Sequence, residues 1–238
     1  MIKALVFDLD NTLYCFDAAH EAGLQALTEE TCRLLDVAPE AVSSLHREAM
    51  QIQQDRAGED NAAIHNRLIR FQIMLEQMGR PISFAPRMAE AYWSAFLACT
   101  RPDPGAEEVL AFAKAAGLTV GVGTNMTADY QFAKLQRLGL LEAVDFLVTS
   151  EEAGADKPDA RVFRLCAEKA GCPAEACVFV GDNFVHDVLG AKAAGLHPVW
   201  LCPDPDREPP VPGIDRLRAL RELPALLRGR FGLEASGG

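Results

Sequence analysis

The chain has 238 residues, of which 49% are hydrophobic and 24% charged, and its formal net charge is −11. This length can bury a sizeable core and suits one domain with a large insertion or two modest domains. The composition excludes collagen-like, disordered and disulfide-scaffold proteins. The negative charge argues against nucleic acid polymers and anionic membrane surfaces as the main partners, because polyanions bind to basic surfaces.

The seven cysteines contain no Cys-x-x-Cys pair, and no apolar segment typical of a signal peptide precedes them. We therefore expect reduced thiols and a cytoplasmic location. The longest nearly apolar stretch, 109–123, is interrupted by Lys114 and Gly117. It predicts a helix, a turn and a strand, and no segment that spans a membrane.

The first predicted element is a short apolar strand at 4–7. From about residue 14 to about residue 100 no convincing strand follows, glycines are few, and long helical patterns cover 18–35 and 61–78. We interpret 14–100 as an all-helical insertion after the first strand. Pro102 and Pro104 mark the return of the chain to the first domain.

Beyond the insertion, short β-rich apolar runs alternate with helical patterns such as 106–116 and 160–170. The runs lie at 118–122, 146–148, 177–180 and 198–201. This alternation predicts an α/β fold, in which a parallel sheet formed by 1–13 and 101–238 carries helices on both faces. After the sheet we expect a loop rich in proline and aspartate at 203–212, an amphipathic segment at 220–227 and a frayed tail.

Polar residues follow four of the predicted strands, at the point where each strand ends. They are Asp8 and Asp10, Thr124 and Asn125, Lys157, and Asp182 with Asp187. Ligands of open parallel sheets bind outside the carboxyl ends of the strands, so we expect these side chains to form one site. Chance alone would produce an Asp-x-Asp-x-Thr match roughly 0.04 times in a chain of this composition.

These four motifs, in this order, resemble the haloacid dehalogenase (HAD) superfamily, and the resemblance covers essentially the whole chain. It implies a Rossmann-like parallel-sheet core with its active site at the carboxyl ends of the strands. Members of the family carry a helical cap between the first and second motifs or an α/β cap between the second and third. Here the long interval lies between Asp10 and Thr124, which indicates a helical cap over 14–100.

The resemblance also implies the roles of the motif residues in phosphoryl transfer. Asp8 would be the nucleophile that forms an aspartyl-phosphate. Asp10 would protonate the leaving group and later activate water. Thr124, Asn125 and Lys157 would bind the transferred phosphate, with Lys157 supplying a fixed positive charge.

The carboxylates of the motifs indicate a magnesium site. Asp8 and Asp182 would repel each other by about 4 kcal/mol at roughly 4 Å and an effective dielectric constant of about 20, unless a cation lay between them. Mg²⁺ prefers such oxygen ligands together with substrate phosphate. The resemblance implies that Asp8, Asp182 and the backbone carbonyl of Asp10 bind the ion. Asp187 would support the site through a metal-bound water or by orienting Lys157.

An aspartate at position 10 indicates phosphoryl transfer and not carbon–halogen cleavage, because the dehalogenases of the family lack it. We expect a phosphomonoesterase for a small soluble metabolite of the nucleotide or sugar phosphate type. A sugar phosphomutase of the same fold and a non-catalytic phospholigand-binding protein remain alternatives. The sequence is compatible with a monomer and with a homodimer.

The substrate itself would be recognised by the insertion, where Tyr14, Phe16 and Asp17 are candidate contacts. Tyr92 and Trp93 are interpreted as core residues, with substrate contact as the alternative. Each motif residue also has a simpler structural explanation when it is taken singly. An aspartate after a strand is often a turn former or a helix cap, for example, and Thr124 with Asn125 could cap a helix that starts at Met126.

Overall fold

The computed structural model describes residues 1–58 and 60–234. The chain forms two compact units, Met1–Cys15 with Arg101–Gly238 and Phe16–Thr100, which we call the core unit and the helical unit. Tyr14, which the sequence placed in the insertion, belongs to the core unit because its backbone bridges to Asp10 and Pro102. The tail predicted to fray, 235–238, lies outside the described residues.

The core unit is built on one parallel six-stranded sheet with the strand order β3-β2-β1-β4-β5-β6. Its strands are β1 (Ala4–Phe7), β2 (Thr119–Thr124), β3 (Phe146–Thr149), β4 (Cys177–Gly181), β5 (His197–Leu201) and β6 (Asp215–Leu217). In the register of the sheet, Phe7 lies beside Val122 on one side and Val180 on the other. The carboxyl ends of β2, β1 and β4 therefore lie side by side.

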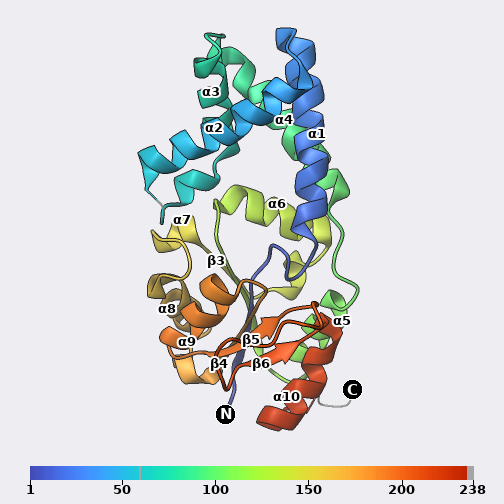
Figure 1. Cartoon of the computed structure of the whole chain (residues 1–238). Helices are drawn as coiled ribbons and strands as arrows, with labels where there is room; N and C mark the ends of the chain where they lie inside the picture. Colours follow the sequence, from blue (N-terminus) through green and yellow to red (C-terminus); the bar gives the residue numbers. More distant parts are fainter. Residues whose placement is uncertain (59, 235–238) are drawn as a thin grey trace. The chain divides into compact units, whose positions relative to one another are not determined.

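Helices cover both faces of this sheet, as the sequence predicted. The helices of the core unit are α5 (Ala106–Ala115), α6 (Ala128–Leu138), α7 (Ser150–Ala153), α8 (Ala160–Lys169), α9 (Gly190–Ala193) and α10 (Leu223–Phe231). Figure 1 shows α8 and α9 on one side of the strands and α5 and α10 on the other. All four residues of β1 are fully buried, as expected for a central strand of a sheet covered on both faces.

Short helical turns complete the core unit. They are η3 (Leu141–Ala143), η4 (Ala174–Ala176), the π-helix η5 (Phe184–Leu189) and η6 (Leu220–Glu222). The sequence missed β6, because this edge strand has only three residues and begins with the polar pair Asp215 and Arg216. The predicted amphipathic segment at 220–227 corresponds to η6 and the beginning of α10.

The helical unit contains four helices and two short turns, and its described residues include no strand. The elements are α1 (Phe16–Leu35), α2 (Pro39–Ala57), η1 (Ala62–His65), α3 (Arg67–Gln77), η2 (Ile82–Phe84) and α4 (Ala85–Cys99). The single helix predicted at 61–78 is interrupted, because the Asn66 side chain accepts a hydrogen bond from the backbone N–H of Ile69 and starts a new helix there.

Tyr92 and Trp93 of α4 are both buried, and their rings meet edge to face with centroids 5.0 Å apart. The Tyr92 hydroxyl and Nδ1 of His20 are within hydrogen-bond distance, at 2.6 Å. These contacts make the two aromatic residues part of the core of the helical unit. Phe16, a candidate substrate contact, packs within the same unit against Phe96.

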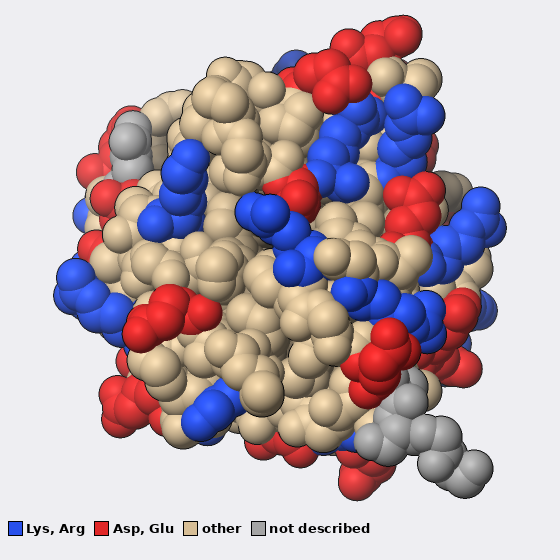
Figure 2. Space-filling view, turned by 90° about the horizontal axis from the view of Figure 1, so that it is seen from below, with Lys and Arg blue, Asp and Glu red and all other residues tan. Residues whose placement is uncertain are grey.

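The described helices include none that is long and apolar enough to cross a membrane. All seven cysteines are free thiols. On the face of the molecule shown in Figure 2, basic and acidic side chains are intermixed. This face therefore offers no continuous basic track of the kind that a nucleic acid polymer requires.

The packing of β2 against α8 leads to a prediction for Gly123. A methyl group there would lie 2.7 Å from Sγ of Cys166 and 3.1 Å from the Phe179 ring. We expect Gly123→Ala to lower the free energy of unfolding by about 1–3 kcal/mol, as overpacking of a core does. Urea unfolding followed by circular dichroism measures this change.

Gly229 of α10 provides the matched control, because a methyl group there meets no atom within 4 Å. Gly229→Ala should stabilise the protein by up to about 1 kcal/mol, since alanine is the better helix former. Equal effects of the two substitutions would contradict the tight packing of α8 on β2.

Candidate active site

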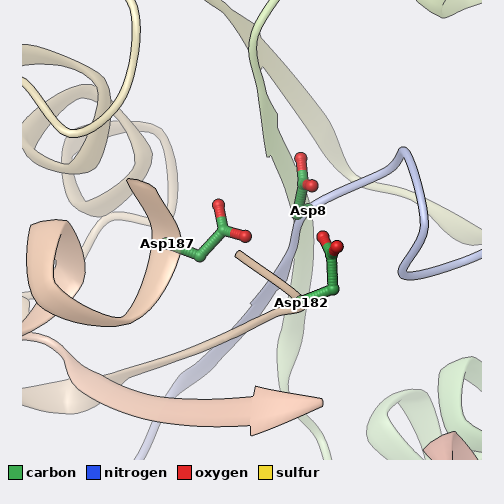
Figure 3. Close-up of side chains that lie close together, drawn as sticks. All are labelled: Asp8, Asp182 and Asp187. Atoms are coloured by element: carbon green, nitrogen blue, oxygen red, sulfur yellow. The ribbon is translucent and has the colours of Figure 1, made fainter. Parts of the chain in front are cut away.

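Three aspartates meet at the carboxyl ends of β1 and β4. Asp8 follows β1 directly, Asp182 follows β4, and Asp187 lies in η5. Figure 3 shows the three side chains close together, with Asp187 pointing toward the other two. One oxygen from each lies within 4.8 Å of the others. The sheet thus brings together three of the acidic residues that the sequence singled out.

Lys157 places a positive charge inside this acidic group. Its Nζ lies 2.7 Å from Oδ1 of Asp8 and 2.7 Å from Oδ1 of Asp187, and the side chain is buried. Among the described residues, no donor reaches the second carboxylate oxygen of Asp8. Lys157 therefore neutralises part of the charge and leaves one oxygen of Asp8 without a hydrogen bond.

Asn125 holds the backbone of Lys157. Its Oδ1 accepts a hydrogen bond of 2.7 Å from the Lys157 N–H, and its Nδ2 donates to the Lys157 carbonyl at 3.4 Å. The sequence predicted that Asn125 binds phosphate. Both of these contacts are with the loop that carries Lys157, and the role of Asn125 in phosphate binding stays a prediction.

Asp187 contacts Lys157 directly, and its role of orienting that lysine stays a prediction. Its Oδ1 accepts from Lys157, and its Oδ2 accepts from the backbone N–H of Asn183 at 2.9 Å. Gly181 permits this arrangement, because a Cβ at that position would lie 2.4 Å from the Asp187 carboxylate. The neighbouring His186 is exposed and its backbone N–H is bound by the Asn183 side chain.

Thr124 ends β2 and contacts a residue that the sequence did not single out. Its Oγ1 accepts a hydrogen bond of 2.8 Å from Nε2 of Gln131, which also donates to the Asn125 carbonyl at 3.0 Å. The next helix begins at Ala128, with Thr127 at its N-cap. Thr124 therefore does not cap a helix, and its hydroxyl lies at the sheet edge near the motifs.

Asp10 lies beyond β1 in a turn that Asn11 allows with its positive φ of 58°. Nζ of Lys134 donates hydrogen bonds to Oδ1 and Oδ2 of Asp10, at 2.8 and 2.9 Å, and the Tyr14 hydroxyl donates to Oδ1 at 2.5 Å. Tyr14, a candidate substrate contact, thus donates its hydroxyl proton to Asp10. Asp17, the remaining candidate contact, is an exposed residue in the first turn of α1.

Gln131 and Lys134 were missed although the sequence contains a signal for them. On α6 they occupy the stripe of buried positions that continues with Leu135 and Leu138. Polar residues on the buried stripe of an amphipathic helix require partners, because an unpaired buried polar group is costly. That pattern predicts a polar partner inside the fold, although it cannot identify which residue it is.

Burial and the closeness of the charged groups shift the pKa values of Asp8, Asp182 and Lys157. Burial raises the pKa of Asp8 to about 8, against the effect of Lys157, and the neighbouring carboxylates of Asp187 and Asp182 raise it further. Burial and Asp187 also raise the pKa of Asp182 to about 6. Burial disfavours the ammonium form of Lys157, yet Asp187 and Asp8 keep its pKa above the ordinary value.

These pKa shifts fit a site for a divalent cation. Three carboxylates share one lysine, so the group retains excess negative charge and holds protons that a cation would displace. Oxygen ligands of this kind suit Mg²⁺. Asp8, Asp182 and Asp187 each have an oxygen close enough to the others to hold such an ion, and Asp187 is in addition engaged by Lys157 and the Asn183 backbone.

Comparison with known proteins agrees with this geometry. Residues 2–195 match the haloacid dehalogenase-like hydrolase family, and the chain belongs to this family of hydrolases. The ribulose-1,5-bisphosphate 5-phosphatase of Halopiger xanaduensis is 35% identical over 212 residues, which cover 87% of this chain and 88% of that protein. The glyceraldehyde 3-phosphate phosphatase of Methanothermobacter thermautotrophicus is 30% identical over 214 residues, covering 84% and 86%.

Among solved structures, a HAD phosphatase from Thermococcus onnurineus superposes with a TM-score of 0.75. The superposition covers 98% of this chain and all of that one, at 23% sequence identity. This similarity concerns the fold, and it agrees with the Rossmann-like parallel sheet described above.

The shifted pKa of Asp182 predicts how the stability of the metal-free protein depends on pH. Because this pKa is about 6 in the folded protein and ordinarily 3.8, the folded state binds more protons than the unfolded chain between these values. The stability contributed by this group is therefore fully present below about pH 4 and is lost as the pH rises through about 6. Asp182→Asn should thus gain on the order of 2 kcal/mol over wild type near neutral pH and nothing near pH 4.

Urea unfolding in the presence of EDTA, at a series of pH values, measures this difference. Asp145→Asn serves as the control of opposite sign, because hydrogen bonds from Lys114 and Val120 overcome the effect of burial and lower the pKa of Asp145. That variant should lose stability relative to wild type at neutral pH. A gain for Asp182→Asn that did not change with pH would contradict the assigned repulsion.

Proposed function

We propose that the protein is a Mg²⁺-dependent phosphomonoesterase that hydrolyses a small phosphorylated metabolite through an aspartyl-phosphate on Asp8. The observation that carries this proposal is the buried Asp8 carboxylate, which lies 2.7 Å from Lys157 and within 4.8 Å of Asp182 and Asp187. A nucleophile, a fixed cation and the ligands of a divalent ion are thereby concentrated at one edge of the sheet.

In the first step, an oxygen of Asp8 attacks the phosphorus atom of the substrate. The new P–O bond to Asp8 forms as the ester P–O bond breaks, and the leaving oxygen takes a proton from Asp10. Lys157 and the Thr124 hydroxyl stabilise the negative charge on the phosphoryl oxygens. Bound Mg²⁺ would neutralise the repulsion between the carboxylate and the phosphate.

In the second step, water hydrolyses the aspartyl-phosphate. Asp10, which gave up its proton in the first step, accepts one from the attacking water molecule. The P–O bond to Asp8 breaks, inorganic phosphate leaves and the Asp8 carboxylate is regenerated. One carboxyl group thus serves as acid and then as base, so both steps depend on where Asp10 is held.

The substrate class is supported by the relatives, which are named for phosphatases of ribulose-1,5-bisphosphate and glyceraldehyde 3-phosphate. We propose that this chain acts on a sugar phosphate or nucleotide of similar size, in the cytoplasm. The helical unit, inserted after β1, would act as the cap that selects the substrate. Its role fits its place in the chain between the first and second motifs.

Replacement of Asp8 tests the nucleophile. Asp8→Asn keeps the size of the side chain but removes the attacking oxyanion, so hydrolysis of p-nitrophenyl phosphate should fall by at least about 10³-fold. Phosphate release measures turnover, and a parallel assay for isomerised sugar phosphate distinguishes hydrolysis from a mutase reaction. Asp36→Asn is the matched control, because Asp36 is exposed and has a φ of 54° that asparagine tolerates.

The metal requirement is tested separately, by activity and by thermal unfolding. EDTA should abolish turnover, and added Mg²⁺ should restore it. Mg²⁺ should also raise the melting temperature of wild type, because a ligand that binds only the folded state stabilises it. This shift should be reduced in Asp182→Asn, which lacks one ligand. Full turnover in EDTA would contradict the proposed role of the acidic group.

A further inference from the structure

Helix α6 directs two buried polar side chains toward two different motifs. Gln131 contacts Thr124, and Lys134, three residues later on the same side of the helix, contacts Asp10. The side chain of Lys134 is fully buried, and Gln131 is buried as well. Leucine or methionine would fill such positions at lower cost, since an ammonium group loses its hydration on burial.

The contacts of Lys134 fix the orientation of the Asp10 carboxylate. Oδ1 of Asp10 accepts from both Lys134 and Tyr14, and Oδ2 accepts from Lys134. A carboxylate offers about four acceptor positions, two on each oxygen. Among the described residues, the open position is on Oδ2. The geometry thereby identifies Oδ2 as the atom that can carry and deliver a proton.

The contact of Gln131 has a different consequence for Thr124. Nε2 of Gln131 donates a hydrogen bond to Oγ1 of Thr124. The Thr124 hydroxyl therefore accepts on the side that faces α6, and its own proton points away from Gln131. Among the residues that the structure describes, that proton has only a long contact of 3.4 Å with the Asn125 carbonyl. The hydroxyl is thus set to donate to a phosphoryl oxygen.

We propose that α6 carries two positioning residues with separable functions. Lys134 positions Asp10 for proton transfer to the leaving group, and Gln131 positions the Thr124 hydroxyl for the phosphoryl group. Neither residue was indicated by the four motifs. The inference rests on the proposed phosphomonoesterase function, in which Asp10 transfers the proton and Thr124 contacts the phosphate.

The two roles respond differently to the leaving group of the substrate. p-Nitrophenolate is a stable anion that leaves without a proton, whereas phenolate and alkoxides depend on general acid catalysis. A defect in proton transfer therefore reduces kcat/KM more for phenyl phosphate than for p-nitrophenyl phosphate. A defect in phosphate binding reduces kcat/KM equally for both, because the transferred group is the same.

The experiment compares kcat/KM for these two substrates in wild type, Lys134→Met and Gln131→Leu, all with Mg²⁺. For Lys134→Met we expect the loss with phenyl phosphate to exceed the loss with p-nitrophenyl phosphate by roughly 10-fold or more, within the range of general acid catalysis. For Gln131→Leu the two losses should be equal. Tyr14→Phe should show the leaving-group effect in weaker form, because it removes one hydrogen bond and no charge.

The controls separate a specific role from a general loss of structure. Lys114→Met removes another lysine–aspartate pair, the one with Asp145, from α5 of the same unit. It should leave both kcat/KM values unchanged. If Lys134→Met does not fold, as judged by its melting temperature, the comparison of the two substrates in Tyr14→Phe decides whether the contacts of Asp10 position it for proton transfer.

Equal losses with both substrates in folded Lys134→Met, or in Tyr14→Phe, would overturn the role of Lys134 in proton transfer while leaving the phosphatase intact. A leaving-group effect in Gln131→Leu would overturn the separation of the two roles. Absence of turnover in wild type with either substrate would instead overturn the proposed function, and this inference with it.

Discussion

The ion pairs of Lys157 are the interaction on which the rest of the site depends. One ammonium group lies between Asp8 and Asp187, 2.7 Å from each, in a buried position where an unpaired charge would be costly. Asn125 supports this arrangement by holding the lysine backbone, and Gly181 supports it by leaving room for Asp187. Asp182 adds a third carboxylate next to this single ammonium group, so negative charge exceeds positive charge in the site. That excess of negative charge is the physical argument for the divalent cation that we propose.

A chain with a net charge of −11 can still bind an anionic substrate, because the electrostatic potential inside the site is set by the charged groups nearest to it. A small phosphorylated metabolite needs a reversal of sign over a few ångströms, which Lys157, the Thr124 hydroxyl and a bound cation would together provide in the proposed function. A polymer would need a basic track along the surface. The proposed phosphate monoester substrate is therefore compatible with the negative net charge of the chain.

The polar face of α6 extends the site behind the four motifs. Gln131 and Lys134 connect the end of β2 and the turn after β1 to one rigid helix, so Thr124 and Asp10 are held in a fixed relation. Catalytic groups placed by such supporting contacts need little rearrangement when the substrate binds. The burial of a lysine on a stripe shared with Leu135 and Leu138 would have its explanation in the positioning role that we propose.

The sequence by itself determined the class of fold and the acidic motifs, because strand periodicity and the residues that follow each strand are local properties of the chain. It also indicated that residues near 14–100 are helical. Only the tertiary structure decided which side chains meet: that Asn125 binds the Lys157 backbone, that Tyr14 and Lys134 bind Asp10, and that Asp187 contacts Lys157. Apart from the local pair of Tyr14 and Asp10, these partners are separated by long stretches of sequence, and strand order and helix rotation, which no local pattern encodes, bring them together.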